Sequence, residues 1–583
     1  MNNVDGEPMS TPAGGSSSDD IDGDSLISVA RLDDENRPVP KRRRTPHGKG
    51  QPSRVASRGW IWSIADCWAG CILAVIILSS MLLTLVWVFE VPILQNPDET
   101  SHIDYAFSIY SAGRLLNVRR PPSQWNLHAQ QEPIENGSKF SHQYTLYLID
   151  ATEFQRVRFH PEEKMSPDYG TAAYYRNLNL NAPHTAARIP DLQPQDNPWL
   201  VKNYPFGYYF AVAVWLRLVR LFKSGPVALF FGARIFSVIL LCGSLILSYA
   251  TLRELRLRKL RALALTSIIA FFPLTNFVSS SVQPDALSWT LMSLCFYLAL
   301  LFRKRPASYS LVAMLGTALG LLVVTKYHFY IFTAAAILSM VVSEHVFKRG
   351  SAKDLLRVAT ILLLPSLLLF VVQLWVAWGN RGLVGGNLSG SLLFPAPGGS
   401  VEGLKNAVVE FYGGGTAFVS WWGLFGWMDA PLIIKSPVVQ KYVLLTLTAL
   451  TVVVLGLFLF RLEQVLTRLV VLARSGRWRT ALRIMFSNPL VNSHFMFTVF
   501  IVALFALTTN GAQGRYWLPY ILSSLLITTE YAPRSLSHRK TQAVVSTLMI
   551  LGLLVFCGIG SYYSIQTIRE RYYVIRTTKE GVG

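Results

Sequence analysis

The chain has 583 residues, of which 51% are hydrophobic and only 15% are charged, a composition far from that of a soluble globular domain. Its net charge of +20 comes from basic side chains that gather in short clusters between long apolar runs. Such clusters are typical of topology signals in membrane proteins, and they do not resemble a nucleic-acid-binding surface. The five cysteines all lie within apolar runs, which excludes a disulfide framework or a zinc-knuckle spacing.

Residues 1–59 form a tail that is rich in Gly, Ser, Pro and acidic residues and then turns basic, which predicts a disordered cytoplasmic segment. This tail is too long and too acidic for the n-region of a signal peptide. The apolar run from Trp60 to Phe89 is therefore predicted to be a retained first transmembrane helix with a cytoplasmic N-terminus.

Residues 90–225 are predicted to form a large first outer loop, because no apolar run from Glu90 to Lys202 reaches the roughly 20 residues that a span requires. The segment 203–222 is ambiguous, since its apolar stretch ends at Leu216 and basic residues follow at helical spacing. We predict an interfacial helix here. The next apolar run ends in a basic cluster, which reaches the cytoplasmic side only if 203–222 does not cross.

From residue 226 onward, apolar runs alternate with basic clusters and predict a second outer loop at 379–436. The fold class expected is an all-α polytopic membrane protein with about 11 transmembrane helices within residues 60–565, followed by a C-terminal tail at 566–583. One feature conflicts with this count, because it places a basic tail on the outer side. The residues concerned are Arg569, Arg571, Arg576 and Lys579.

With this topology, the unusual polar residues all fall at the outer ends of the predicted spans. Ionisable groups at membrane depth are costly and usually functional or paired, although groups at helix ends can also snorkel. The residues are Asp98, Glu99, His102, Asp104, Arg234, Asp285, Lys326, His328, Asp429 and Arg515. Their convergence predicts a site at the outer face.

The first candidate group follows the first span, in Asn96-Pro97-Asp98-Glu99 with His102 one turn later. An acid pair at the membrane surface can supply a general base, and Asp98, Glu99 and His102 together could hold a divalent cation. The alternative is ordinary helix punctuation, with Asn at the N-cap, Pro at the first helical position and acids in the first turn.

The second candidate is Arg515, in Gln513-Gly514-Arg515-Tyr516-Trp517. A guanidinium at the rim of a helix is suited to bind a lipid phosphate bidentately, and Lys326 or Arg234 could serve the same anion. The alternative is an arginine that snorkels among interfacial Tyr and Trp residues.

Two further motifs carry candidate substrate-binding residues. Asp285 could bind a sugar hydroxyl or pair with a cation, or it could simply cap a helix. Trp427 and Asp429 lie in a Trp- and Gly-rich stretch, where indole faces could stack on sugar rings or form an aromatic belt. The motifs of ATP-driven pumps, zincins and serine hydrolases are absent from the sequence.

Taken together, these motifs resemble those of a bacterial family of predicted membrane proteins of unknown function that is grouped with the GT-C glycosyltransferases. The resemblance covers residues 60–565 and rests on motifs in a shared order. They are Asn96-Pro97-Asp98-Glu99 with His102, Tyr204-Pro205-Phe206-Gly207, Gln283-Pro284-Asp285, Phe425-Gly426-Trp427-Met428-Asp429 and Gln513-Gly514-Arg515-Tyr516.

The resemblance implies a GT-C-like fold with juxtamembrane helices in the first outer loop. It also implies a polyprenyl-phosphate-linked sugar as donor and an acidic base, a role that falls on Asp98 with Glu99 as its neighbour. We further expect Arg515, Lys326 and Arg234 to bind the donor phosphate, and His102 and Tyr516 to contact substrate. The expected activity is inverting sugar transfer to a surface glycan or glycolipid at the outer face of a bacterial cytoplasmic membrane, with no certain cofactor. A flippase or a polymerase of lipid-linked glycans is the alternative.

Overall fold

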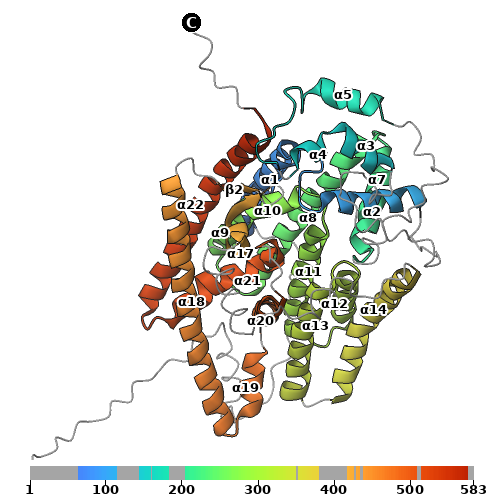
Figure 1. The fold of residues 1–583 in the computed structure, drawn as a ribbon. Helices are drawn as coiled ribbons and strands as arrows, with labels where there is room; N and C mark the ends of the chain where they lie inside the picture. The colour runs from blue at the N-terminus through green and yellow to red at the C-terminus, as the bar shows by residue number, and fades with distance from the viewer. Residues whose placement is uncertain are drawn as a thin grey trace, which may run out of the picture. The chain divides into compact units, whose positions relative to one another are not determined.

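The computed structural model describes residues 64–113, 143–158, 160–182, 204–349, 352–379, 416–425, 429–432, 437–486, 488–508 and 514–574. These residues are almost entirely helical (Figure 1). One short antiparallel pair joins β1 (Leu424–Phe425) to β2 (Ala430–Pro431). The predicted tail 1–59, most of the predicted second outer loop and Trp427 lie outside the described residues.

The first half of the bundle contains nine helical segments. They are α1 (Ile64–Glu90), α8 (Pro226–Glu254), α9 (Lys259–Phe271), α10 (Pro273–Ser279), α11 (Pro284–Lys304), α12 (Tyr309–Val323), α13 (Tyr327–Val342), the π-helix η6 (Ser343–Arg349) and α14 (Ala352–Gly379). Pro273 separates α9 from α10, which meet at a bend of 58° because proline cannot continue the helical hydrogen bonding. A Cβ at Gly316 of α12 would lie 2.6 Å from the carbonyl oxygen of Leu362, so α12 and α14 pack closely through this glycine.

The first loop carries five described helices, which are α2 (Glu99–Ala112), α3 (Gln143–Ala151), α4 (Phe154–Val157), α5 (Ala172–Leu180) and α7 (Gly207–Arg220). At 1.5 Å per residue, the 14 residues of α7 rise about 21 Å, which is short of the roughly 30 Å hydrocarbon core. Its buried face packs against α2 and α8. This agrees with the interfacial helix predicted at 203–222. We call the end of the bundle at which α1 ends and these helices lie the loop end.

The second half of the bundle is more broken. Its described elements are α17 (Thr416–Gly423), α18 (Pro437–Arg474), α19 (Trp478–Met485), α20 (Pro489–Thr508), the 3-10 helix η7 (Gly514–Tyr520), α21 (Ile521–Leu526), the π-helix η8 (Ile527–Tyr531), the 3-10 helix η9 (Ala532–Ser535) and α22 (Arg539–Tyr572). The change from 3-10 to α to π geometry between η7 and η8 divides one apolar run into short segments, a pattern often found at functional sites.

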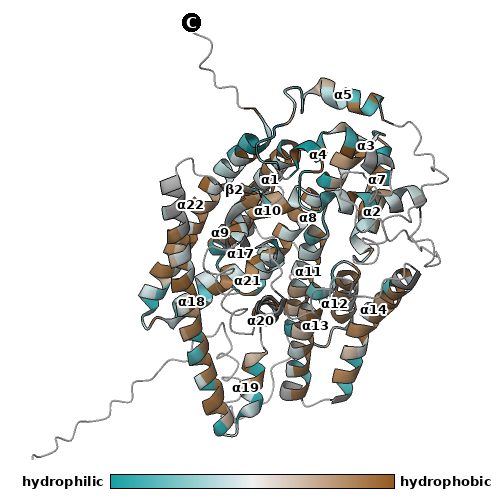
Figure 2. Ribbon diagram, in the orientation of Figure 1, coloured by the Kyte–Doolittle hydropathy of each residue, from teal (hydrophilic) through white to brown (hydrophobic). Residues whose placement is uncertain are grey.

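Seven of the described helices are long and apolar enough to cross a membrane, and up to nine spans result if each of two bent pairs counts as one. The predicted total of about 11 spans is therefore not confirmed. Two predicted spans are not helices long enough to cross a membrane. The helix α12 has only 15 residues, and the run 517–531 is divided between η7, α21 and η8. Apolar residues run along the lengths of α14, α18 and α22 (Figure 2).

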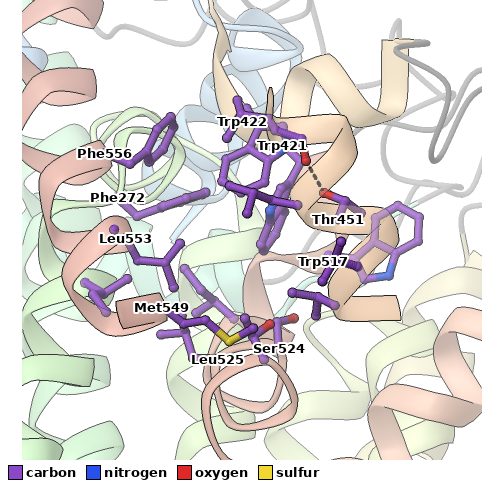
Figure 3. A pocket seen from close by; sticks show the side chains of 18 of the residues that line it. Phe272, Trp421, Trp422, Thr451, Trp517, Ser524, Leu525, Met549, Leu553 and Phe556 are labelled. Atoms are coloured by element: carbon purple, nitrogen blue, oxygen red, sulfur yellow. Dashed lines mark hydrogen bonds between the residues drawn. The ribbon is translucent and has the colours of Figure 1, made fainter. Parts of the chain in front are cut away.

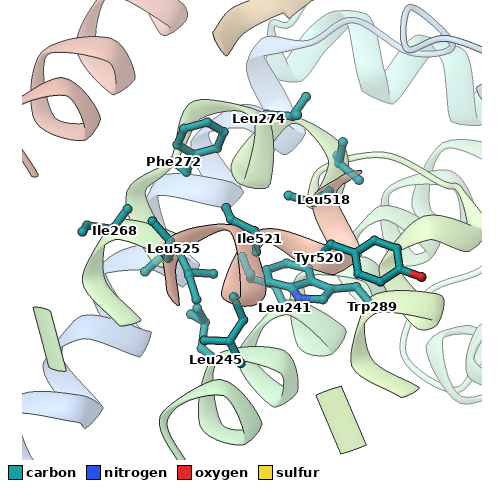
Figure 4. Close-up of a cluster of buried hydrophobic side chains, with 14 of the residues drawn as sticks. Leu241, Leu245, Ile268, Phe272, Leu274, Trp289, Leu518, Tyr520, Ile521 and Leu525 are labelled. Atoms are coloured by element: carbon teal, nitrogen blue, oxygen red, sulfur yellow. The ribbon is translucent and has the colours of Figure 1, made fainter. Parts of the chain in front are cut away.

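The largest core cluster joins both halves of the bundle below the loop end. Figure 4 shows Trp289 of α11 and Leu241 of α8 packed with Leu518 of η7 and Ile521 and Leu525 of α21. Trp289 is completely buried, and large buried aromatic side chains contribute several kcal/mol of packing. This core fixes η7, and with it the residues that precede Leu518, against α8 and α11.

The C-terminal end of α22 lies at the loop end. Tyr573 donates a hydrogen bond to the carbonyl oxygen of Glu90 at 2.9 Å, and Arg569 forms an ion pair with the Glu90 carboxylate. Arg571 pairs with Asp429 at 2.7 Å. Two of the four basic residues that conflict with the charge rule, Arg569 and Arg571, are thus matched by acids, and the other two lie outside the described residues. The helix continues to Tyr572, beyond residue 565 where the sequence analysis ends the transmembrane domain.

Candidate functional site

Asp98 stands immediately before α2 in a left-handed backbone conformation, with φ 62° and ψ 1°. This conformation costs a non-glycine residue on the order of 1–2 kcal/mol, and such residues cluster at functional sites. The Asp98 side chain makes no capping hydrogen bond to α2, and it is 45% exposed. A helix-capping role therefore does not explain the position of the Asp98 carboxylate.

The Asp98 carboxylate is paired with Arg515 of η7. Nη2 of Arg515 lies 2.7 Å from Oδ2 of Asp98, and Nη1 donates to Oε1 of Gln283 at 3.2 Å. Burial raises the pKa of Asp98, but the charge and hydrogen bond of Arg515, together with the nearby His102 and Arg158, more than offset this, so that the pKa lies below its usual value. The Arg515 side chain is only 10% exposed, which contradicts the alternative of an arginine that snorkels at the interface.

A second ion pair lies in the same charge cluster. Nζ of Lys326 lies 2.5 Å from Oδ1 of Asp285, which occupies the first turn of α11. Both side chains are largely buried, with exposures of 11% and 4%. The Tyr516 ring links the two ion pairs, because its centroid lies 5.6 Å from Nζ of Lys326 and 5.9 Å from Cζ of Arg515. The structure thus brings Asp98, Asp285, Lys326, Arg515 and Tyr516 together at the loop end.

His102 lies one turn into α2 and is buried. Its Nδ1 lies 2.8 Å from the hydroxyl oxygen of Tyr209 on α7, and its ring lies edge-on to Tyr204 at 5.1 Å. Burial lowers the pKa of His102 to about 4, although the nearby Asp98 carboxylate opposes this shift. The imidazole is therefore neutral at pH 7.

The depressed pKa of His102 predicts a loss of stability in acid. An unfolded histidine takes up a proton near pH 6.5, whereas the folded one does so only near pH 4. The contribution of neutral His102 to the stability of the folded protein is therefore fully present above pH 6.5, and it is lost as the pH falls towards 4. We expect the melting temperature to fall more between pH 7.5 and pH 5 for the wild-type protein than for His102→Gln. An equal fall in the two proteins would contradict this assignment.

Arg234 was predicted to bind the donor phosphate, and the structure does not support this role. Its side chain is completely buried, and all five of its N–H groups are used. Nε and Nη2 donate to the Glu99 carboxylate at 2.9 and 2.6 Å. Nη1 and Nη2 also donate to the carbonyl oxygens of Val88, Val91 and Pro92 at 2.6–2.9 Å. No donor is left for a ligand.

Glu99 was predicted to share the catalytic role, and the structure places its carboxylate in the buried ion pair with Arg234. Besides the two bonds from Arg234, its carboxylate accepts bonds from the backbone N–H of Val282 at 3.0 Å and from the side chain of Asn96 at 3.5 Å. It is completely buried. The Glu99–Arg234 pair thus joins the end of α1, the start of α2, α8 and the turn before α11, and it holds the backbone that carries Asp98.

In the structure, Asp98, Glu99 and His102 are not arranged as a metal site. Glu99 is fully occupied by Arg234 and its other partners, and Nδ1 of His102 lies against Tyr209. Across the described ranges, no group of three or more His, Cys, Asp or Glu side chains is arranged to hold a metal ion.

Asp429 was predicted to bind substrate together with Trp427. Oδ2 of Asp429 instead accepts bonds from Nε and Nη2 of Arg571 at 2.9 and 2.7 Å. Arg571 in turn donates to the carbonyl oxygens of Val157 and Glu163. Asp429 is therefore engaged by Arg571, which links the end of α22 to the first loop.

Sequence reasoning missed Arg158, which follows α4. Its charge acts on Asp98 and is in turn affected by it, so its positive charge counts with those of the cluster. The local sequence offers no signal for this role, because Arg156 two residues earlier looks equivalent. Arg156 instead pairs with Glu153 and Glu163 on the surface.

An apolar cavity of about 580 Å³ adjoins this cluster through η7. Figure 3 shows Trp421, Trp422 and Trp517 around it, with Phe272 and Phe556 side by side. Further residues of α18, α21 and α22, most of them aliphatic, extend the lining, and Ile268 of α9, His494 and Thr498 of α20 and Thr528 of η8 complete it. The helix η7 thus presents Arg515 and Tyr516 to the charge cluster and Trp517 to the apolar cavity.

Comparison with solved structures finds two kinds of protein at low sequence identity. ArnT from Cupriavidus metallidurans, in a crystal structure bound to undecaprenyl phosphate, is 14% identical over 87% of this chain and 78% of that chain, with a TM-score of 0.42. The archaeal oligosaccharyltransferase AglB from Archaeoglobus fulgidus, in complex with an inhibitory peptide and a dolichol-phosphate, is 10% identical over 88% of this chain and 57% of that chain, with a TM-score of 0.40.

No curated protein sequence matches the chain. A family model does match, and it aligns with residues 81–524, well over half of the length. That family is described as a predicted membrane protein family, which agrees with the several apolar helices long enough to span a bilayer. The chain belongs to the DUF2142 family of predicted membrane proteins.

Proposed function

We propose that the chain is a membrane glycosyltransferase that moves a sugar from a polyprenyl-phosphate donor to a hydroxyl of a surface glycan or glycolipid. The reaction would take place at the outer face of a bacterial cytoplasmic membrane. The observation that carries this proposal is the partly exposed Asp98 carboxylate held by Arg515, with Lys326 across the Tyr516 ring and an apolar cavity adjoining through η7. This set combines a base, cations for a phosphate and room for an isoprenoid chain.

The chemistry is a single displacement with inversion at the anomeric carbon. The acceptor hydroxyl oxygen attacks that carbon, and its proton passes to the Asp98 carboxylate. The bond between the anomeric carbon and the phosphate oxygen breaks, and the electron pair leaves with the phosphate. Arg515 and Lys326 stabilise the negative charge that develops there.

The arrangement needs no ATP, because a lipid phosphate is already a good leaving group. Positioning of the two reactants and charge stabilisation then supply most of the rate enhancement. The buried Glu99–Arg234 pair contributes by fixing the strained backbone at Asp98.

Deletion of the gene in the native strain tests this function. We expect a surface glycan that lacks one sugar, together with accumulation of a polyprenyl-phosphate-linked sugar on the outer leaflet. Reintroduction of the wild-type gene should reverse both changes. An unchanged glycan and an unchanged lipid pool would contradict the proposal. Lipid-linked intermediates trapped on the inner leaflet would instead identify a flippase, and accumulated lipid-pyrophosphate-linked repeat units would identify a polymerase.

A further inference from the structure

Asp98 occupies a position that an anionic ligand of this site would need. Its Oδ2 is bound to Nη2 of Arg515 at 2.7 Å, and the charge of Arg158 also acts on it. Nε of Arg515 is buried and has no hydrogen-bond partner among the residues that the structure describes. The carboxylate is therefore held by Arg515, which has an unused buried donor, and it also feels the charge of Arg158.

The charge balance of the cluster favours an added anion. Arg158, Lys326 and Arg515 contribute three positive charges, while Asp98 and Asp285 contribute two negative ones, and His102 is neutral. A phosphodiester adds a single negative charge, whereas a phosphate monoester carries about −1.5 to −2 at pH 7. The cluster can therefore neutralise a diester, but it cannot fully neutralise a monoester while Asp98 stays ionised.

We propose that Asp98 and the lipid phosphate compete for Arg515 and Arg158, so that proton uptake by Asp98 and departure of the phosphate are coupled. This inference rests on the proposed function and deepens it. The donor is a phosphodiester, and cleavage turns its phosphate into a monoester with a second negative charge. At the same step Asp98 gains the acceptor proton and becomes neutral, so it no longer attracts the two arginines. They are released to bind the leaving group when its charge increases.

Two features of the structure fit this exchange. Asp98 is 45% exposed and stands in the loop before α2, whereas Arg515 is nearly buried and is held by Gln283. The arginine is thus the fixed partner and the carboxylate the accessible one. Trp517, two residues after Arg515, lines the apolar cavity (Figure 3). An amphiphile whose chain fills this cavity would therefore place its phosphate close to Arg515.

The competition predicts that removal of the Asp98 charge strengthens the binding of a polyprenyl monophosphate. Full-length protein in lipid nanodiscs is titrated with undecaprenyl phosphate, and with undecaprenol as a probe that has the same chain but no phosphate. We expect Asp98→Asn to lower the Kd for undecaprenyl phosphate about fivefold and to leave the Kd for undecaprenol unchanged. Arg158→Gln and Arg515→Gln should each raise the Kd for the phosphate about tenfold.

Matched variants separate this effect from a loss of folding. Asp98→Gly also removes the charge and suits the left-handed backbone, so it should lower the Kd as Asp98→Asn does. Glu90→Gln removes a carboxylate that is paired with Arg569 at the same end, and it should leave the Kd unchanged. Unchanged or weaker binding by both Asp98 variants would overturn the competition while leaving the donor class intact. Failure of the wild-type protein to bind undecaprenyl phosphate would overturn both this inference and the proposed donor.

Discussion

Replacement of Asp98 by Asn is expected to lower the initial rate of sugar incorporation about 10²- to 10⁴-fold, the usual contribution of a general base. The amide cannot accept the proton of the acceptor hydroxyl. Asn also tolerates the left-handed conformation at φ 62°, so the backbone should be preserved. The measurement is pulse labelling of the surface glycan in the deletion strain, complemented with each variant at an equal protein level.

Asp150→Asn is the matched control, because Asp150 is an exposed aspartate on α3 of the same first loop. It should complement fully. A normal incorporation rate with Asp98→Asn would remove Asp98 from the role of base. If Asp98→Asn binds undecaprenyl phosphate more tightly in the binding experiment and yet transfers no sugar, its defect lies in the chemical step.

Replacement of Arg234 by Met is expected to have the largest effect on stability. It leaves the Glu99 carboxylate buried without its partner, which typically costs about 3–5 kcal/mol. The three backbone carbonyls at the end of α1 would also lose their donors. We expect a clear fall in the melting temperature of the detergent-solubilised protein, measured by intrinsic fluorescence.

The double variant Glu99→Gln/Arg234→Met should recover part of this loss, because no buried charge then remains unpaired. Glu90→Gln, which breaks the more exposed pair with Arg569, should cost about 1 kcal/mol or less. A Glu99→Gln variant with full thermal stability and no sugar transfer would overturn the structural assignment and restore Glu99 to the catalytic group.

The sequence was sufficient to predict that this is a helical membrane protein with a non-spanning helix near residues 207–220. Long apolar runs and the charges between them are local properties, and the energetics of the bilayer act on them directly. The same reasoning predicted that four charged residues lie together at one end of the helical bundle, because each stands at the end of an apolar run. They are Asp98, Asp285, Lys326 and Arg515. Span counting was less successful where α12 is short and the segment after Arg515 is broken.

Only the tertiary structure distinguished Asp98 from Glu99. The two acids are adjacent in sequence, but a step of one residue into a helix turns the side chain by about 100°. Glu99 thereby meets Arg234, which lies 135 positions away in the chain, and is buried with all its acceptors satisfied. Asp98 stays outside the helix and faces Arg515. The influence of Arg158 on Asp98 likewise became visible only in the fold, because charges that are distant in sequence interact only once the fold has brought them near one another.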